Sequence, residues 1–317
     1  MTAAGMLAQA GVWEFYQSAL WGGAAIAVFC GVLSVFVVLR RMAFIGEGIA
    51  HGAFGGVGVA LLVELALGQA AGSVWLRDGI VAAFCVASAL TIGFLTRRAR
   101  LSEDSAIGIC LVAAMALGVI LLEVRQHLSS APTPTLHQIL FGNLVFIRPE
   151  EVWLAWGLAA LVVLATAALF RPLVFFSFDE EAAQVFGVPT ALMHYGLLVV
   201  LALAIVLAVR SMGVILAGAL LILPGSTGRM WSDRIGRVLA VSVLTAVGGM
   251  VAGFLLAVCL GMLSPEPVIV LLMTAVFAVS YVVRTLRRRS GPSVDSQRRE
   301  PGSRGRASSR TAPPKRP

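Results

Sequence analysis

The run ALWGGAAIAVFCGVLSVFVVL, residues 19–39, contains no charged side chain. A helix of about 20 apolar residues is long enough to cross the hydrocarbon core of a membrane. The run is typical of the chain, which has 317 residues, 59% hydrophobic and 13% charged, and a mean hydropathy of +0.92. Soluble domains carry about 25% charged residues, because their surface must be polar. The composition excludes a soluble enzyme, a disordered regulator and a secreted disulfide domain, and predicts an all-α polytopic membrane protein.

Apolar runs separated by charged residues predict about nine transmembrane helices. After 19–39 the runs lie at residues 43–67, 79–96, 104–122, 151–170, 191–209, 212–229, 237–260 and 266–284. No basic residue precedes Arg40, so the first run lacks the flank of a signal peptide and we expect it to remain a span. Pro224 predicts a bend in the helix 212–229, because proline removes a backbone hydrogen bond.

The arginines predict which ends of these helices are cytoplasmic. With the N-terminus outside, the inner loops hold 13 arginines, at 40, 41, 97, 98, 100, 171, 229, 234, 237, 284, 287, 288 and 289. The outer loops then hold four, at 77, 125, 148 and 210. Basic residues concentrate in cytoplasmic loops, so we expect the N-terminus outside the cell and the C-terminus in the cytoplasm.

The net charge is +8; seven of the basic residues lie after position 290, and most of the others lie near the ends of the apolar runs. A topology signal explains this charge better than nucleic-acid binding does. We therefore expect three parts: an extracytoplasmic segment 1–18, a permease domain 19–286 and a disordered basic tail 287–317. The tail has too few apolar residues to fold. Contact of the tail with anionic lipid headgroups remains open beside a plain solvated tail.

Two ionisable residues in the second run predict a metal site. Ionisable side chains inside a membrane are costly and mark functional sites. Glu47 and His51 stand four residues apart, so a helix places them on one face. A carboxylate and an imidazole suit zinc, manganese or iron, and a symmetric dimer would bring four such ligands together. Two alternatives remain: a Glu–His hydrogen bond that only packs two helices, and side chains near the cytoplasmic mouth that merely meet water.

The segment FDEEAAQVFGVP, residues 178–189, predicts a short helix outside the membrane. Asp179 is a good N-cap, and Glu180 and Glu181 suit the first turn. Gly187 and Pro189 end the helix. Two turns are marginal alone in water, which implies a partner surface. A simple connector on the membrane surface is the alternative.

Several segments, in unbroken order over residues 20–285, resemble the permease subunits of metal-type ABC importers. RMAFIGEGIAHGA at 41–53 is similar to the signature of that family's second span. The further similar segments are EDSAIG at 103–108, LFG at 140–142, FDEEA at 178–182 with Gly187, and the Leu-rich stretch 214–228 that contains LILPG. The family usually has Asp where this chain has Glu47, which moves the carboxylate by one methylene.

The resemblance implies a homodimer, or a pair with a closely related permease, together with cytoplasmic ABC ATPase subunits and an extracytoplasmic metal-binding protein. It implies that Glu47 and His51 bind the transported metal in the translocation path. It also implies that residues 179–187 form a coupling helix that contacts the ATPase, through Asp179, Glu180, Glu181, Ala182, Phe186 and Gly187. Pro224 and Gly225 are further candidates for the path, since broken helices line such paths. Glu64, near the outer end of the second span, is a candidate for its vestibule, and a side chain that only reaches water is the alternative.

The sequence also predicts what the chain itself does not contain. A P-loop needs a lysine before Ser or Thr, and the sole lysine, Lys315, precedes Arg316, so ATP hydrolysis is expected in a partner subunit. The four cysteines form no close pair, and we expect no tightly bound cofactor. Two other functions remain open: a siderophore, haem or cobalamin permease, and a cation transporter that needs no ATPase.

Overall fold

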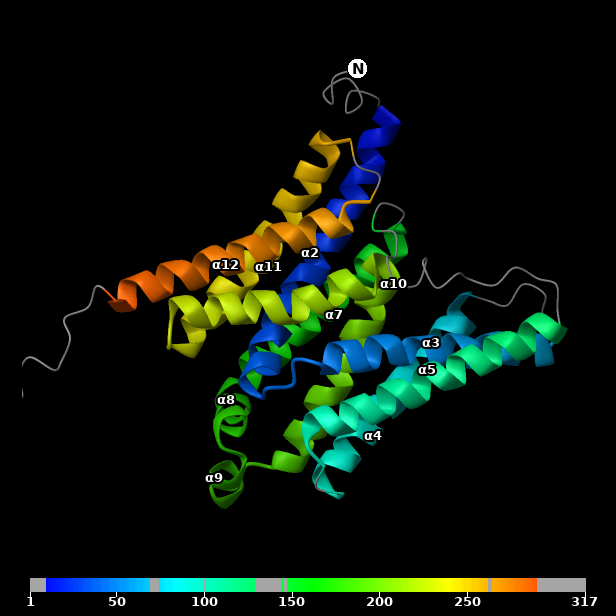
Figure 1. The fold of residues 1–317 in the computed structure, drawn as a ribbon, viewed down its shortest axis with the longest axis horizontal. Helices are drawn as coiled ribbons and strands as arrows, with labels where there is room; N and C mark the ends of the chain where they lie inside the picture. Colours follow the sequence, from blue (N-terminus) through cyan, green and yellow to red (C-terminus); the bar gives the residue numbers. More distant parts are fainter. Residues whose placement is uncertain are drawn as a thin grey trace, which may run out of the picture.

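The computed structural model describes residues 10–68, 74–99, 101–128, 144, 147–261 and 264–289. Ten helices lie in this part of the chain (Figure 1). They are α2 Ala10–Leu39, α3 Ile45–Ala66, α4 Val74–Arg97, α5 Glu103–Leu128, α7 Pro149–Ala168, α8 Phe170–Phe178, α9 Glu180–Val185, α10 Thr190–Trp231, α11 Ile235–Cys259 and α12 Glu266–Arg289.

Eight of the helices in the described part are long and apolar enough to cross a membrane. The all-helical membrane fold expected from the composition is therefore confirmed. The helix α2 begins at Ala10, so residues 10–18 are helical, although the sequence assigned them to a segment before the first span. Most of the predicted tail, residues 290–317, lies outside the described residues.

The two predicted spans 191–209 and 212–229 lie in one long helix, α10. Its 42 residues would form a rod of about 63 Å, about twice the hydrocarbon thickness of a membrane. The backbone of α10 is non-helical at Gly213, with φ 80° and ψ 168°. Figure 1 shows that the two halves of α10 run in different directions. Each half is therefore long enough for one crossing, and a total of nine crossings stays a prediction.

The break in α10 is at Gly213, before Pro224, and a bend at Pro224 itself stays a prediction. Pro224 removes one hydrogen-bond donor, but its fixed φ is compatible with helical geometry. The conformation at Gly213 is open only to a residue without a side chain. A glycine, not the proline, therefore divides this helix.

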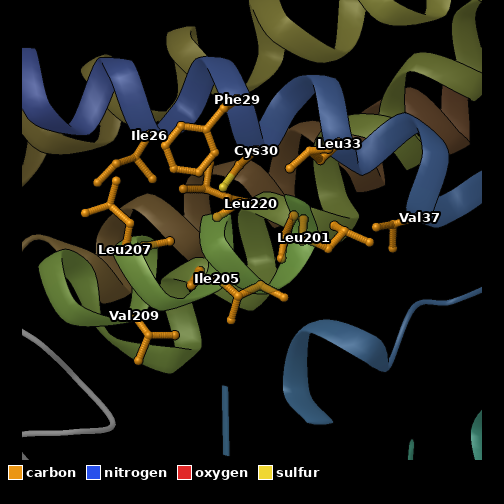
Figure 2. Packing of buried hydrophobic residues seen from close by; sticks show 14 of the residues in the cluster. Ile26, Phe29, Cys30, Leu33, Val37, Leu201, Ile205, Leu207, Val209 and Leu220 are labelled. Carbon is orange, nitrogen blue, oxygen red and sulfur yellow. The ribbon is translucent and has the colours of Figure 1, made fainter. Parts of the chain in front are cut away.

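The core of the molecule lies between α2 and α10. Cys30 and Phe29 of α2 are fully buried, as is Leu220 of α10. Figure 2 shows the contact between the two helices. Its labelled side chains are Ile26, Phe29, Cys30, Leu33 and Val37 from α2, and Leu201, Ile205, Leu207, Val209 and Leu220 from α10. Burial of these apolar side chains fixes the two central helices against each other.

Glycines let α3 approach its neighbours closely. A Cβ at Gly48 would lie 2.6 Å from the Ile107 side chain of α5, and a Cβ at Gly55 would lie 2.7 Å from the Ala114 oxygen of the same helix. Towards α4, a Cβ at Gly56 would lie 3.1 Å from the Val81 backbone. Small residues at helix contacts in membranes allow this close packing. The three helices α3, α4 and α5 therefore form one tightly packed unit.

Candidate functional site

Glu47 and His51 lie in the first turns of α3 and face each other. The Nδ1 atom of His51 is 3.4 Å from Oε2 of Glu47 and 3.0 Å from the backbone oxygen of Glu47. A carbonyl oxygen only accepts hydrogen bonds, so Nδ1 carries the proton and donates it to this oxygen. The lone pair of Nε2 is then available to a metal ion, as in histidine ligands whose other nitrogen is held by a carbonyl.

The local structure of α3 favours a carboxylate at this place. A turn of residues 40–44, in which Arg41 has a φ of 59°, connects α2 to α3. Glu47 then falls in the first turn of α3, where the unpaired backbone N–H groups stabilise a negative charge. The side chains of Glu47 and His51 are 36% and 23% exposed, so an ion can reach both.

The helix α10 supplies the wall beside this pair. A Cβ built at Gly218 would lie 2.6 Å from Oε1 of Glu47, so no larger residue fits there without moving the carboxylate. Gly46 faces the same helix, where its Cβ would lie 3.3 Å from Leu221. The pair therefore lies where α3 meets the second half of α10, after the break at Gly213.

One chain supplies two metal-binding side chains at this place. In the part of the chain that the structure describes, no three His, Cys, Asp or Glu side chains lie close enough together to hold an ion. A second Glu-x-x-x-His pair occurs in α5, at Glu123 and His127, and both of these residues are exposed. The spacing alone is therefore not specific, and the contact of Glu47 with α10 distinguishes the first pair.

The helix α9 has the caps that the sequence predicts. The Asp179 carboxylate accepts a hydrogen bond from the Ala182 N–H at 2.9 Å, and Gly187 ends the segment with a φ of 82°. Val185 and Phe186 project outward, with 85% and 78% of their surface exposed. Figure 1 shows α9 at an edge of the molecule, beside α8. The apolar end of α9 is therefore open to a partner.

One member of the predicted ATPase-facing set, Glu180, points toward the permease, and Ala182 is only partly exposed. The Glu181 side chain is exposed, whereas the Glu180 carboxylate lies 3.0 Å from Arg40 and 2.9 Å from Arg97. Ala182 is half-buried. Glu180 therefore faces the permease, not the outside.

The three candidates for the metal path lie on two helices, α3 and α10. Glu64 is buried near the other end of α3, 3.4 Å from the Arg77 guanidinium. Pro224 and Gly225 are buried in α10, and the Gly225 N–H donates to the Ser34 hydroxyl of α2 at 2.8 Å. Their place in a path stays a prediction. The part of α10 that contacts Glu47 is Gly218, which no sequence signal distinguishes from the other glycines.

Similar proteins support one family. Residues 12–284 match the ABC 3 transport family. The chain is 31% identical over 269 residues to the manganese transport system membrane protein MntC of Halalkalibacterium halodurans, covering 85% of this chain and 87% of that protein. It is 30% identical over 287 residues to the manganese import system permease protein ScaB of Streptococcus parasanguinis, covering 89% and 95%.

A solved structure has the same fold. PsaBC from Streptococcus pneumoniae, in complex with Fab, superposes with a TM-score of 0.72 and 26% identity, over 91% of this chain and 99% of that one. The family match covers all the helices from α3 to α11, including the Glu47–His51 pair and α9. The chain belongs to the ABC 3 transport family.

Proposed function

We propose that this chain is the membrane permease of an ABC importer, and that it carries a divalent transition metal ion bound by Glu47 and His51. The observation that carries the proposal is the pair itself, with the carboxylate and the imidazole 3.4 Å apart and both partly exposed. Membership of the family and its manganese-transporting relatives support the choice of cargo. Manganese, zinc and iron all accept this pair of ligands.

The site is completed by a second permease. Two ligands hold a divalent ion weakly, whereas two copies of the pair supply two nitrogens and two carboxylates. The lack of a third metal-binding side chain near the pair, within the described residues, supports a shared site. A homodimer provides it directly, and a closely related second permease provides it equally.

The orientation follows from the arginines. In the topology that we propose, thirteen of them fall at the cytoplasmic ends of the predicted spans or between them, and four fall on the other side. We place the N-terminal segment 1–18 outside the cell and the tail 287–317 in the cytoplasm, with the permease domain 19–286 between them. An extracytoplasmic binding protein then delivers the ion on one side, and ATPase subunits dock against residues 179–187 on the other.

Transport proceeds by alternating access. The ATPase subunits hydrolyse ATP, and their closure displaces the coupling helices and moves the permease helices around the Glu47–His51 pair. The chain itself has no P-loop lysine and takes no part in hydrolysis. The ion is cargo, and the proposal needs no tightly bound cofactor.

The proposal is tested by manganese uptake in cells that carry Glu47→Ala or His51→Ala. Each variant removes one of the two ligands that a chain contributes, so we expect uptake at limiting metal to fall about 10- to 100-fold. The matched controls are Glu123→Ala and His127→Ala, which remove the same residue types at the same spacing from an exposed face of α5. We expect these controls to take up manganese normally.

Normal uptake in both Glu47→Ala and His51→Ala would refute the site. An equal loss in the α5 controls would show that the effect is not specific to the α3 pair. The amount of each permease in the membrane, measured on a gel, separates loss of transport from loss of protein.

A further inference from the structure

Four charged side chains from four segments meet at Glu180. They form a cluster, called here the Glu180 cluster, of Arg40, Arg97, Glu103 and Glu180. Glu180 accepts from Arg40 at 3.0 Å and lies 2.9 Å from Arg97, and Arg40 also lies 3.7 Å from Glu103. Arg40 follows α2, Arg97 ends α4, Glu103 begins α5 and Glu180 begins α9. The Glu180 carboxylate therefore joins α9 to the end of α2 and to α4, and Arg40 extends the cluster to α5.

Both arginines of the cluster are held in place by further contacts. The Arg40 side chain is 11% exposed, its guanidinium lies 4.2 Å from the centre of the Phe176 ring, and it donates to the Phe176 oxygen at 3.4 Å. Arg97 donates to the Thr190 hydroxyl at 3.2 Å. Ion pairs that are shielded from water and fixed by other bonds are much harder to break than exposed surface pairs.

Each helix joined by the Glu180 cluster either leads to α3, called here the metal helix because it carries Glu47 and His51, or packs against it. Arg40 begins the turn 40–44, which runs directly into the first turn of α3, where Glu47 lies. The helices α4 and α5 pack against α3 through its glycines, as at Gly48 and Gly56. A displacement of Glu180 is therefore applied both to the start of α3 and to the two helices that hold it.

The two ends of α9 have different contacts, since one end is exposed and the other belongs to the Glu180 cluster. Val185 and Phe186 are open to a partner, while Glu180 at the opposite end of α9 is bound to the permease. A force on the exposed end is passed to the arginines by a helix of six residues, which is too short to absorb it by bending.

We infer that Glu180 is a positioning residue that transmits the movement of α9 to the metal helix, through its ion pairs with Arg40 and Arg97. The inference rests on the proposed function, since it requires an ATPase partner that moves α9. It concerns the internal link, not the surface that the ATPase contacts. Without the carboxylate, α9 can move while α3 stays behind, and ATP hydrolysis no longer yields full transport.

The test uses the complete transporter, with the permease, the ATPase and the extracytoplasmic binding protein, in liposomes. Manganese uptake and ATP hydrolysis are measured together for Glu180→Gln, which keeps the size of the side chain and removes its charge. We expect an assembled complex that hydrolyses ATP and transports about tenfold less manganese per ATP, a loss within the range usual for coupled sites. We expect a similar loss for Arg97→Gln, and no additional loss in the double variant.

Asp104→Asn is the matched control, because it removes a neighbouring, exposed carboxylate that has no ion pair among the described residues. We expect it to transport as much manganese per ATP as the unmodified complex. Unchanged transport per ATP in Glu180→Gln would overturn the inference. Loss of assembly or of hydrolysis in that variant would also overturn it, because Glu180 would then serve docking or folding.

The proposed function is judged separately in the same liposomes. An unmodified complex that moves no manganese, or a Glu47→Ala complex that moves it normally, would count against the metal site and not against the link. A transporter with normal Glu47 dependence and normal coupling in Glu180→Gln would leave the proposed function intact and refute the link.

Discussion

Gly218 leaves room for the carboxylate of Glu47 because it has no side chain. Its Cβ would lie 2.6 Å from Oε1 of Glu47, closer than such atoms approach in proteins. The space left by this glycine accommodates the carboxylate of Glu47 where α10 faces α3.

We expect Gly218→Ala to displace the Glu47 carboxylate and to weaken metal binding about tenfold, the effect usual for residues that position a ligand. The measurement is the manganese concentration that gives half-maximal uptake, which should rise. Glu47→Asp in the same chain shortens the side chain and should restore much of the affinity. Gly196→Ala, on the same helix with no atom within 4 Å of the added carbon, is the control.

An unchanged concentration for half-maximal uptake in Gly218→Ala would contradict this account. So would a double variant with Glu47→Asp that binds no better than Gly218→Ala alone. Either outcome would mean that the carboxylate is free to turn away from α10.

At the scale of single residues, the sequence predicts the metal-binding side chains but not the residues of other helices that contact them. Glu47 and His51 are visible because ionisable residues are rare in an apolar run, and their spacing fixes a common helix face. Gly218 is one of 33 glycines, and its contact with Glu47 depends on how two distant helices pack. Arg40 and Arg97 look like topology signals, and their pairing with Glu180 joins segments far apart in the chain.

The helix α10 changes direction at Gly213. The conformation there, φ 80° and ψ 168°, belongs to a region that residues with a side chain avoid. Hydropathy predicts both halves of α10 as separate spans, since each is apolar. It cannot locate the break at Gly213, because both halves are apolar and Pro224 is the stronger local signal for a bend.

We expect Gly213→Ala to destabilise the folded permease by about 1–3 kcal/mol, the usual cost of holding a side chain in this region. The melting temperature of the purified protein in detergent should fall accordingly. Gly196→Ala lies in a regular part of the same helix and should leave the melting temperature unchanged or raise it, since alanine favours helix more than glycine does. An equal melting temperature for Gly213→Ala and the unmodified protein would show that α10 tolerates a side chain at the break.

The number of crossings decides how the whole molecule lies in the membrane. Eight helices of the described part could each cross, and α10 could cross twice. An odd total places the two termini on opposite sides of the membrane. The arginines favour this arrangement, with 13 on the side of Arg40 and four on the other.

Two reporters at the C-terminus test this topology. Because we place the tail in the cytoplasm, a green fluorescent protein fused there should fluoresce, and an alkaline phosphatase fused there should be inactive. An epitope at the N-terminus should bind antibody from outside intact cells. Both ends on one side would mean that α10 crosses once or that another helix does not cross.

The close packing of α3 also limits how this sequence can evolve. Every base change that replaces a glycine adds a side chain. At Gly48 an added carbon meets the Cγ2 methyl of Ile107, so a smaller residue at that position in α5 would make the change tolerable. At Gly55 it meets the backbone oxygen of Ala114, which no substitution removes. Gly48 can therefore be replaced if Ile107 also changes, whereas Gly55 cannot be replaced by any residue with a side chain without moving the backbone of α5.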